Sequence, residues 1–341
     1  MALTIESDPL RLMAQTLRDR RVQRGTIRDR FRRLRVGLVN NMPDAAFAAT
    51  ERQFSSLIEA ASDDFDIRLT LVALDSTPRE GQMREAMAAT YRDPRLFRLS
   101  SPDAMIVTGA EPRAARLDEE PYWDELTALL DWSRGGLVAA LYSCLAAHAA
   151  AWHRDRIVRR RLFGKLSGVY ESEIVAPHEL TEGLTRAFTP HSRFNALAEC
   201  DLEFKGYLTL TRSDEAGPDV FVRERELLEV FWQGHPEYDR DTLAREFRRD
   251  MLRFAKGERA APPLAPANYF DREASARIEA ALQGAVDLES LAAALNPEAL
   301  SPAEAFWRES SKILMRNWLT AIARRKAQGR LDEAQRARFG G

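Results

Sequence analysis

Cys144, one of two cysteines, follows an apolar run at 137–142 and precedes an alanine-rich run at 146–152. The first run predicts a buried strand of a parallel sheet, and the second predicts a helix because alanine is the strongest helix former. A thiol between a strand and a helix sits where open α/β sheets bind ligands, and the helix dipole favours its thiolate. These residue types indicate a cysteine nucleophile; the alternative is a small buried apolar side chain.

His235 and Glu237 provide partners for such a thiol. They follow an apolar strand predicted at 228–232, and Pro236 stiffens the backbone between them. Because the carboxyl ends of parallel strands open on one edge of the sheet, Cys144 can meet His235, whose ring Glu237 would orient. We therefore predict a Cys-His-Glu triad. The alternative is an ordinary loop with a hydrogen-bonded histidine.

The elements that would position this triad alternate between strand and helix. Strands are predicted at 35–39, 68–74 and 103–107, with a helix beginning near Thr50 and another near Pro121. The segment 75–100 is predicted to be a long loop or lid with a short helix. This alternation favours an α/β fold with a doubly wound, mostly parallel sheet.

Shorter β-type runs in the middle of the chain indicate an antiparallel extension of the sheet. They lie at 164–175, 202–204, 207–211 and 219–223, with a polar loop predicted at 190–195. A helix at 240–256, a proline-rich break at 260–267 and a mainly helical remainder follow. We therefore predict an N-terminal basic helical segment at 1–34, a catalytic domain at 35–270, and a C-terminal helical region at 271–341 that packs on the catalytic domain.

Composition limits the function classes. The 341 residues are 45% hydrophobic and carry a formal net charge of -2, which gives the molecule no electrostatic preference for nucleic acid or a membrane. Two cysteines without a Cys/His cluster argue against a disulfide framework and a metal site. No apolar run approaches the roughly 20 residues of a spanning helix, so we expect a cytoplasmic protein. The arginine-rich stretch at 18–35 is expected to be a solvated face or subunit contact, or to bind an anionic ligand.

Short motifs along the chain add a resemblance. In order they are Thr108-Gly109-Ala110, Tyr122-Trp123, Cys144, Lys165-Leu166-Ser167-Gly168-Val169, Pro190-His191-Ser192-Arg193, Gly234-His235-Pro236-Glu237-Tyr238-Asp239, Thr242-Leu243, Arg249-Asp250, Asn268-Tyr269-Phe270, Trp307-Arg308 and Asn317-Trp318-Leu319. Their order and spacing, from about residue 35 to about residue 321, resemble the homoserine O-acyltransferases of the homoserine O-succinyltransferase family.

The resemblance implies a fold like that of class I glutamine amidotransferases and a ping-pong acyl transfer. The acyl group would pass from acyl-coenzyme A, through a thioester, to an amino-acid hydroxyl, in methionine biosynthesis. Cys144 would then be the nucleophile, His235 the general base and Glu237 its orienting carboxylate. We expect succinyl-coenzyme A and homoserine as small-molecule substrates, no cofactor beyond this co-substrate, and a homodimer.

Substrate-binding positions are also implied by the resemblance. Ser192 and Arg249 match positions in the family's substrate pocket, and Arg249 suits the carboxylate of the acceptor because a guanidinium binds it bidentately. Lys165 lies in a motif that matches the family, and we expect it to bind substrate as well. Arg113 falls where the family places the residue that selects between succinyl and acetyl groups, so a guanidinium there could pair with the succinyl carboxylate; the alternative is a solvent-exposed side chain beside Glu111.

One departure concerns the oxyanion. Asn41-Met42-Pro43 is followed by Asp44, whereas the family usually carries lysines there, one of which helps to stabilise the thioester oxyanion. Another cation or a backbone N–H must replace that lysine, or the chemistry differs. An acetyl donor, another hydroxy amino acid, an amidotransferase-like hydrolase and a non-catalytic relative are the alternatives.

Overall fold

An eight-stranded sheet forms the centre of the computed structural model, which describes residues 3–6, 32–284 and 287–339. The strand order is β1 (Leu3–Glu6), β3 (Asp66–Val72), β2 (Arg33–Val39), β4 (Ala104–Val107), β5 (Ala139–Ser143), β12 (Leu228–Trp232), β11 (Val220–Glu224) and β8 (Leu208–Thr209). Neighbours run parallel from β1 to β12, whereas β11 and β8 are antiparallel. The predicted mostly parallel sheet with an antiparallel extension is confirmed.

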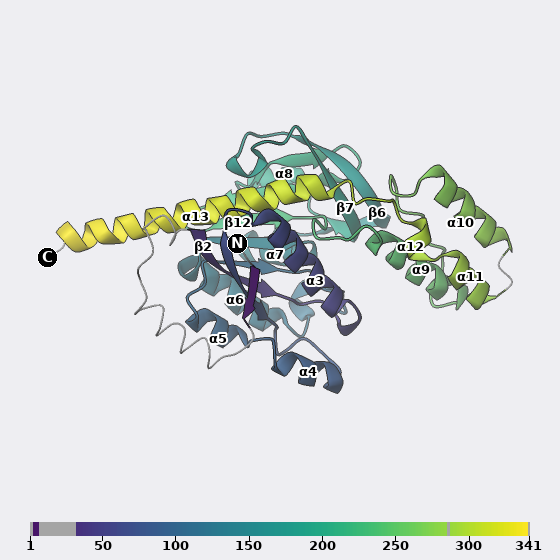
Figure 1. The fold of residues 1–341 in the computed structure, drawn as a ribbon, viewed down its shortest axis with the longest axis horizontal. Helices are drawn as coiled ribbons and strands as arrows, with labels where there is room; N and C mark the ends of the chain where they lie inside the picture. The colour runs from purple at the N-terminus through teal and green to yellow at the C-terminus, as the bar shows by residue number, and fades with distance from the viewer. Residues whose placement is uncertain (1–2, 7–31, 285–286, 340–341) are drawn as a thin grey trace.

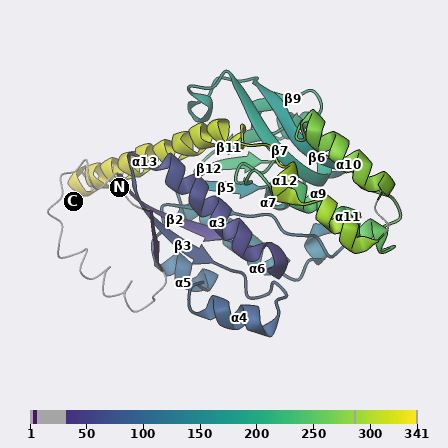
Figure 2. The ribbon, with the colours of Figure 1, turned by 45° about the vertical axis from the view of Figure 1, so that its right-hand side comes forward.

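Helices cover both faces of this sheet. On one face, α3 (Asp44–Ala61) and the long α13 (Arg308–Phe339) lie side by side and share a core with the strands. On the other face lie α5 (Pro94–Leu99), α6 (Trp123–Gly136) and α7 (Leu145–Asp155). Figure 1 shows α13 crossing the molecule in yellow, and Figure 2 shows α3 in front of the strands. The two layers bury the sheet, as its apolar strands require.

A second sheet rises beside the first. It has the order β10 (Gly217–Pro218), β9 (Thr211–Ser213), β6 (Arg160–Ile174) and β7 (Arg186–Ala196), with all pairs antiparallel. The polar loop predicted at 190–195 is wrong, because these residues lie inside β7. Two of their polar side chains are buried rather than solvated: His191 is inaccessible, and the Arg193 guanidinium donates to the carbonyls of Asn195 and Ala216.

Three other expectations differ from the structure. Residues 202–204 end a short helix, α8 (Glu199–Phe204), whose first turn is acidic, as favoured by the helix dipole. The segment 75–100 contains two helices, α4 (Gly81–Ala88) and α5. The N-terminal segment is strand at 3–6 and from Arg33 onward; residues 7–31, with most of the arginine-rich stretch, lie outside the described residues.

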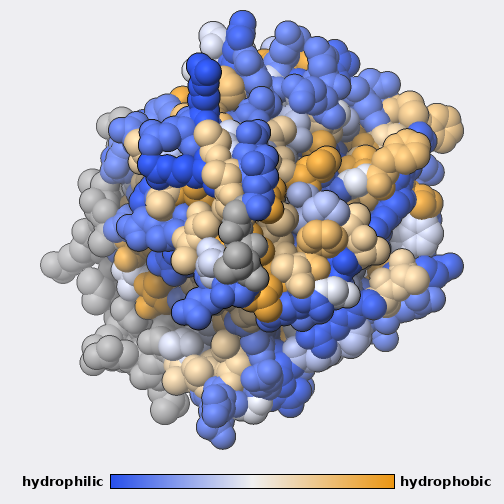
Figure 3. Space-filling view, turned by 90° about the vertical axis from the view of Figure 1, so that its right-hand side faces the viewer, coloured by the Kyte–Doolittle hydropathy of each residue, from blue (hydrophilic) through white to orange (hydrophobic). Residues whose placement is uncertain are grey.

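A group of helices forms one end of the molecule. It comprises α9 (Thr242–Ala255), α10 (Arg272–Gly284), α11 (Leu288–Ala294) and α12 (Pro297–Leu300), which share a small core. Figure 3 shows this end, where apolar patches lie between hydrophilic side chains. Leu282 of α10 and Leu288 of α11 are exposed. The boundary at residue 270 stays a prediction, although α9 and α10 share a core across it. Within the described residues, no helix is long and apolar enough to span a membrane.

Gly168 holds the proline-rich segment against β6. The Gly168 φ is +149°, and a Cβ there would lie 2.3 Å from the carbonyl oxygen of Ala267, which also accepts the Val169 N–H at 2.9 Å. We expect Gly168→Ala to lower the free energy of unfolding by about 2 kcal/mol or more, because the contact is with backbone. Gly164→Ala, on the same strand with nothing near its Cβ, is the control. Urea unfolding measures both, and equal losses would contradict the assignment.

Candidate active site

Cys144 occupies a sharp turn between β5 and α7. Its backbone has φ 51° and ψ -112°, a conformation that a non-glycine residue adopts only when its surroundings enforce it. The Cys144 N–H donates to the Trp232 carbonyl at 2.8 Å, which fastens the turn to the end of β12. The thiol is a partly exposed free cysteine. This is the geometry of a nucleophile elbow, in which a strained turn presents the side chain at the edge of the sheet.

His235 and Glu237 reach the same edge from the end of β12. Both are buried, and His235 Nδ1 lies 2.9 Å from Glu237 Oε1. The thiol of Cys144 acts electrostatically on the His235 ring. The His235 N–H donates to the Pro190 carbonyl of β7 at 2.8 Å, and the imidazole stacks on Tyr238 with ring centroids 4.2 Å apart. The structure therefore brings the three predicted triad residues together.

The surroundings of His235 favour its protonated form. Burial opposes protonation of His235, but the negative charges of Cys144 and Glu237, with hydrogen bonds to both, raise the pKa of His235 well above its ordinary value. An imidazolium beside a thiolate is the reactive form of a cysteine nucleophile. Because the folded-state pKa of His235 is raised, protonation of His235 stabilises the fold fully below the ordinary histidine pKa, and this contribution is lost as the pH rises through the raised value.

Backbone groups stand next to the thiol. A Cβ on Gly109 would lie 3.5 Å from the Cys144 Cβ and 3.4 Å from the Leu145 nitrogen, so the end of β4 abuts the first turn of α7. Leu145 begins α7, and the first N–H groups of a helix have no acceptor within it. Such N–H groups can hold an oxyanion. These N–H groups offer a replacement for the oxyanion-stabilising lysine that this sequence lacks after Pro43.

The turn where that lysine would stand has a different partner. Arg79, which the sequence analysis did not single out, donates to the Met42 carbonyl and to Asp44 Oδ1, both at 3.0 Å, and stacks on Phe47. Burial lowers the pKa of Arg79, although Asp44 opposes this effect. The Arg79 guanidinium thus fixes the Asn40–Asp44 turn, which the Asn41 N–H joins to Thr108 Oγ1 at 2.9 Å.

Lys165, Ser192 and Arg249 meet at two carboxylates of α9. Lys165 Nζ lies 3.0 Å from Glu246 Oε2 and 3.1 Å from Asp250 Oδ2, the Ser192 hydroxyl donates to Glu246, and Arg249 Nε donates to Asp250 at 3.0 Å. Sequence analysis gave Glu246 and Asp250 no role in the site. Their i, i+4 spacing on a predicted helix, with Arg249 between them, was the available signal.

Tyr238 connects this cluster to the triad. Its hydroxyl donates to Glu246 Oε1 at 2.7 Å, while its ring stacks on His235. Burial raises the pKa of Glu246, but the Lys165 charge and the hydrogen bonds from Ser192 and Tyr238 outweigh it, so the pKa is lowered. The site therefore presents a fixed carboxylate and the half-exposed guanidinium of Arg249 near the nucleophile.

Two further contacts fix the loop that carries Glu237 and Tyr238. Trp307 Nε1 donates to the Tyr238 carbonyl, and Arg308 Nη1 donates to the Glu237 carbonyl, both at 3.0 Å. Trp307 is completely buried. Trp307 and Arg308, at the start of α13, thus fix the backbone of the loop that carries Glu237.

Arg113 is an exposed residue of the loop that follows β4. Its backbone N–H donates to Glu120 Oε1 at 2.8 Å, and its charge acts on the Tyr122 hydroxyl. Where the structure describes the chain, no hydrogen bond or ion pair joins Arg113 to Cys144 or to the α9 carboxylates. The same described residues contain no group of three or more His, Cys, Asp or Glu side chains that could hold a metal ion.

Comparison with known proteins gives consistent matches. The family model described as homoserine O-succinyltransferase matches residues 15–328. A homoserine O-succinyltransferase from Methylorubrum extorquens is 46% identical, covering 87% of this chain and 89% of its own length. Those from Rhodopseudomonas palustris and Bradyrhizobium japonicum are 44% and 43% identical, each covering 85% of this chain and 88% or 90% of their own.

Two solved structures also match this chain over most of its length. A glutamine amidotransferase from Thermotoga maritima shares 14% identity, with 85% of this chain and 98% of that chain covered, at a TM-score of 0.46. One from Methylobacillus flagellatus shares 13% identity, with 85% and 95% covered, also at 0.46.

The His235–Glu237 contact can be tested through proton binding. Glu237→Gln removes a negative charge 2.9 Å from His235 Nδ1 and should lower the pKa of His235 by about one to three pH units. NMR titration of the imidazole measures the change. Glu59→Gln, at an exposed position on α3, should leave the titration unchanged. Identical titrations of Glu237→Gln and the wild type would show that Glu237 does not hold the imidazolium.

Proposed function

Because the chain belongs to the homoserine O-succinyltransferase family, we propose that it transfers a succinyl group from succinyl-coenzyme A to the hydroxyl of homoserine. It is an enzyme of the transferase class. The observation that carries the proposal is the strained Cys144 beside the buried His235–Glu237 pair. We further propose a role in methionine biosynthesis, in the cytoplasm, as expected from the sequence resemblance. The homodimer stays a prediction.

The first half-reaction uses the ion pair. The Cys144 thiolate attacks the thioester carbonyl, and the developing oxyanion accepts the Leu145 N–H at the start of α7. Collapse of the tetrahedral intermediate breaks the bond to coenzyme A. The departing thiolate takes the proton of the His235 imidazolium, which leaves a succinyl thioester on Cys144 and a neutral imidazole.

The second half-reaction restores the starting state. Neutral His235, oriented by Glu237, takes the proton of the homoserine hydroxyl as its oxygen attacks the thioester carbonyl. Collapse then expels the Cys144 thiolate, so O-succinylhomoserine leaves and the ion pair forms again. Burial of His235 and Glu237 keeps the pair in a low-dielectric environment, where its electrostatic effect is strongest.

The α9 cluster suits an amino-acid acceptor. Arg249 is half exposed and can bind the carboxylate of the acceptor bidentately. Glu246 can accept hydrogen bonds from the acceptor's ammonium group. Lys165 and Ser192 hold Glu246 in place. An acetyl donor or another hydroxy amino acid would react by the same two steps, whereas a hydrolase would use water in the second half-reaction. A donor-by-acceptor panel with free coenzyme A as readout separates these three alternatives.

The covalent step is tested on the two cysteines. We expect Cys144→Ala to lower kcat by about 10⁴-fold or more and to form no succinyl adduct, because the nucleophile is removed. Cys200→Ala removes the other free thiol and should keep both adduct and activity. Intact mass spectrometry after incubation with succinyl-coenzyme A gives the readout. An adduct on Cys144→Ala would disprove the proposed thioester.

The acceptor step is tested on α9. Arg249→Ala should raise the KM for homoserine by about ten- to a hundred-fold, because a charge-assisted contact is lost, and leave Cys144 acylation intact. The control is Arg245→Ala, whose exposed guanidinium pairs with Asp241. Stopped-flow release of coenzyme A isolates the first half-reaction. Slowing of that step by Arg249→Ala would assign Arg249 to the donor or to structure.

A further inference from the structure

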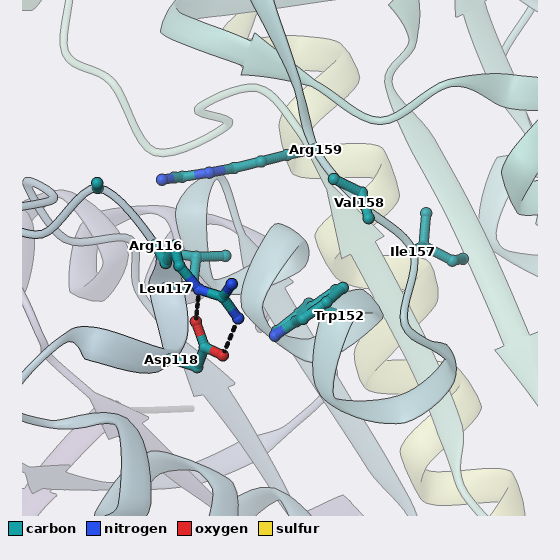
Figure 4. A pocket seen from close by; sticks show the side chains of 8 residues that line it. Arg116, Leu117, Asp118, Trp152, Ile157, Val158 and Arg159 are labelled. Atoms are coloured by element: carbon teal, nitrogen blue, oxygen red, sulfur yellow. Dashed lines mark hydrogen bonds and ion pairs between the residues drawn. The ribbon is translucent and has the colours of Figure 1, made fainter.

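A pocket lies at the opposite end of α7 from Cys144. It has a volume of about 320 Å³ and is walled by residues 115–118, by Trp152 and by residues 157–159 (Figure 4). Leu117, Trp152, Ile157 and Val158 give it apolar surface, whereas Arg116 and Arg159 bring guanidinium groups. An apolar lining with a few charged groups is typical of small-molecule sites, and the volume lies within their usual range.

Arg159 is an incompletely satisfied cation in this pocket. Its Nη1 is buried and has no hydrogen-bond partner among the described residues. Burial lowers the pKa of Arg159, although Tyr122 and Glu120 act in the opposite direction. A buried guanidinium nitrogen without a partner is unfavourable, so a ligand that offers an anionic oxygen would be bound there. In Figure 4 the Arg159 side chain extends from the start of β6 toward the loop of Arg116.

Trp152 supplies a surface for a planar group. Its indole lines the pocket, and the Arg156 guanidinium lies over the same ring at 5.4 Å from the centroid. Nucleobases stack on aromatic side chains and on guanidinium planes whatever their hydrogen-bonding pattern. Arg116 is engaged by Asp118 at 2.6 Å, but this pair is exposed, so a phosphate can compete for the guanidinium.

The two segments that line the pocket are continuous in the chain with segments of the active site. The loop that reaches 115–118 begins at Gly109, which abuts Cys144, and the segment at 157–159 continues into β6, which carries Lys165. Between them, α7 rises about 12 Å from Cys144 to Trp152. The extended pantetheine arm of coenzyme A can span that distance.

We propose that this pocket binds the adenosine diphosphate part of acyl-coenzyme A, with the base against Trp152 and a phosphate on Arg159. The proposal rests on the proposed function, because it assigns the donor's nucleotide to a site away from the thioester. The thioester then reaches Cys144 through the pantetheine arm.

A larger hollow elsewhere has the wrong charge. It measures about 460 Å³ and is lined by the carboxylates of Glu171, Glu173, Asp214 and Glu215 as well as by Arg186 and Arg212. Four carboxylates would repel phosphates. This hollow supplies a matched control, because Arg186 pairs with Glu171 at its exposed rim.

The binding test uses free coenzyme A and the full chain. Calorimetry should show that Arg159→Gln and Trp152→Leu each raise the Kd for coenzyme A by about ten- to a hundred-fold, whereas Arg186→Gln leaves it unchanged. Thermal unfolding of each variant checks the fold, and the two independent substitutions keep the test informative if one of them disturbs it. A Kd unchanged in both variants would overturn the proposal.

The kinetic test compares two donors. Succinyl-coenzyme A and succinyl-pantetheine share the thioester and the arm, but only the first carries the nucleotide. Arg159→Gln should raise the KM for succinyl-coenzyme A by about ten-fold or more and leave that for succinyl-pantetheine unchanged. Equal losses with both donors would make Arg159 a structural residue and overturn the proposal.

The two proposals fail in different ways. If the wild type acylates homoserine from neither donor, the proposed function is wrong, and calorimetry with coenzyme A still decides about the pocket. Binding that Arg159→Gln weakens would support a nucleotide site even then. No binding of coenzyme A to the wild type would overturn it.

Discussion

The parallel pairing of β5 with β12 is the constraint on which the site depends. Ser143 is paired with Trp232, so the two strands end at the same level and Cys144 and the segment leading to His235 leave the sheet side by side. The hydrogen bond from the Cys144 N–H to the Trp232 carbonyl extends the ladder by one residue into the strained turn. A shift of register by one residue would reverse the side-chain directions and separate the thiol from the imidazole.

A second set of contacts keeps these strand ends in place. Gln233 Oε1 accepts the Leu197 N–H and lies 3.0 Å from His148 Nε2, which joins the end of β12 to α7 one turn after Cys144. Burial lowers the pKa of His148 to about 3, so its ring is neutral and suited to this contact. Asp219 Oδ1 accepts the Gly234 N–H at 3.0 Å. These hydrogen bonds hold the end of β12 beside Cys144 and His235, the two groups that the chemistry needs.

The strands of the parallel sheet and the triad could be predicted from sequence because their signals are local. The apolar runs just before Cys144 and His235 indicate buried strands, and the reactive side chains come directly after them. The role of the α9 carboxylates could not be assigned in this way. Glu246 and Asp250 join the site through contacts with Lys165 of β6 and Ser192 of β7, which are far away in the sequence. The strand at 190–195 was missed for a related reason: His191 and Arg193 have loop-like polarity but are buried against partners far along the chain.

The contacts of Trp307 and Arg308 with the catalytic loop have a consequence for synthesis of the protein. The carbonyls of Glu237 and Tyr238 accept hydrogen bonds from Arg308 and Trp307, which leave the ribosome after most of the chain has been made. Until then the parallel sheet can form, but the loop that carries Glu237 lacks the hydrogen bonds from Trp307 and Arg308. Helix α3 also lacks α13, which packs beside it. The surroundings of His235 are therefore completed late in the order of synthesis, by residues that follow the rest of the sheet along the chain.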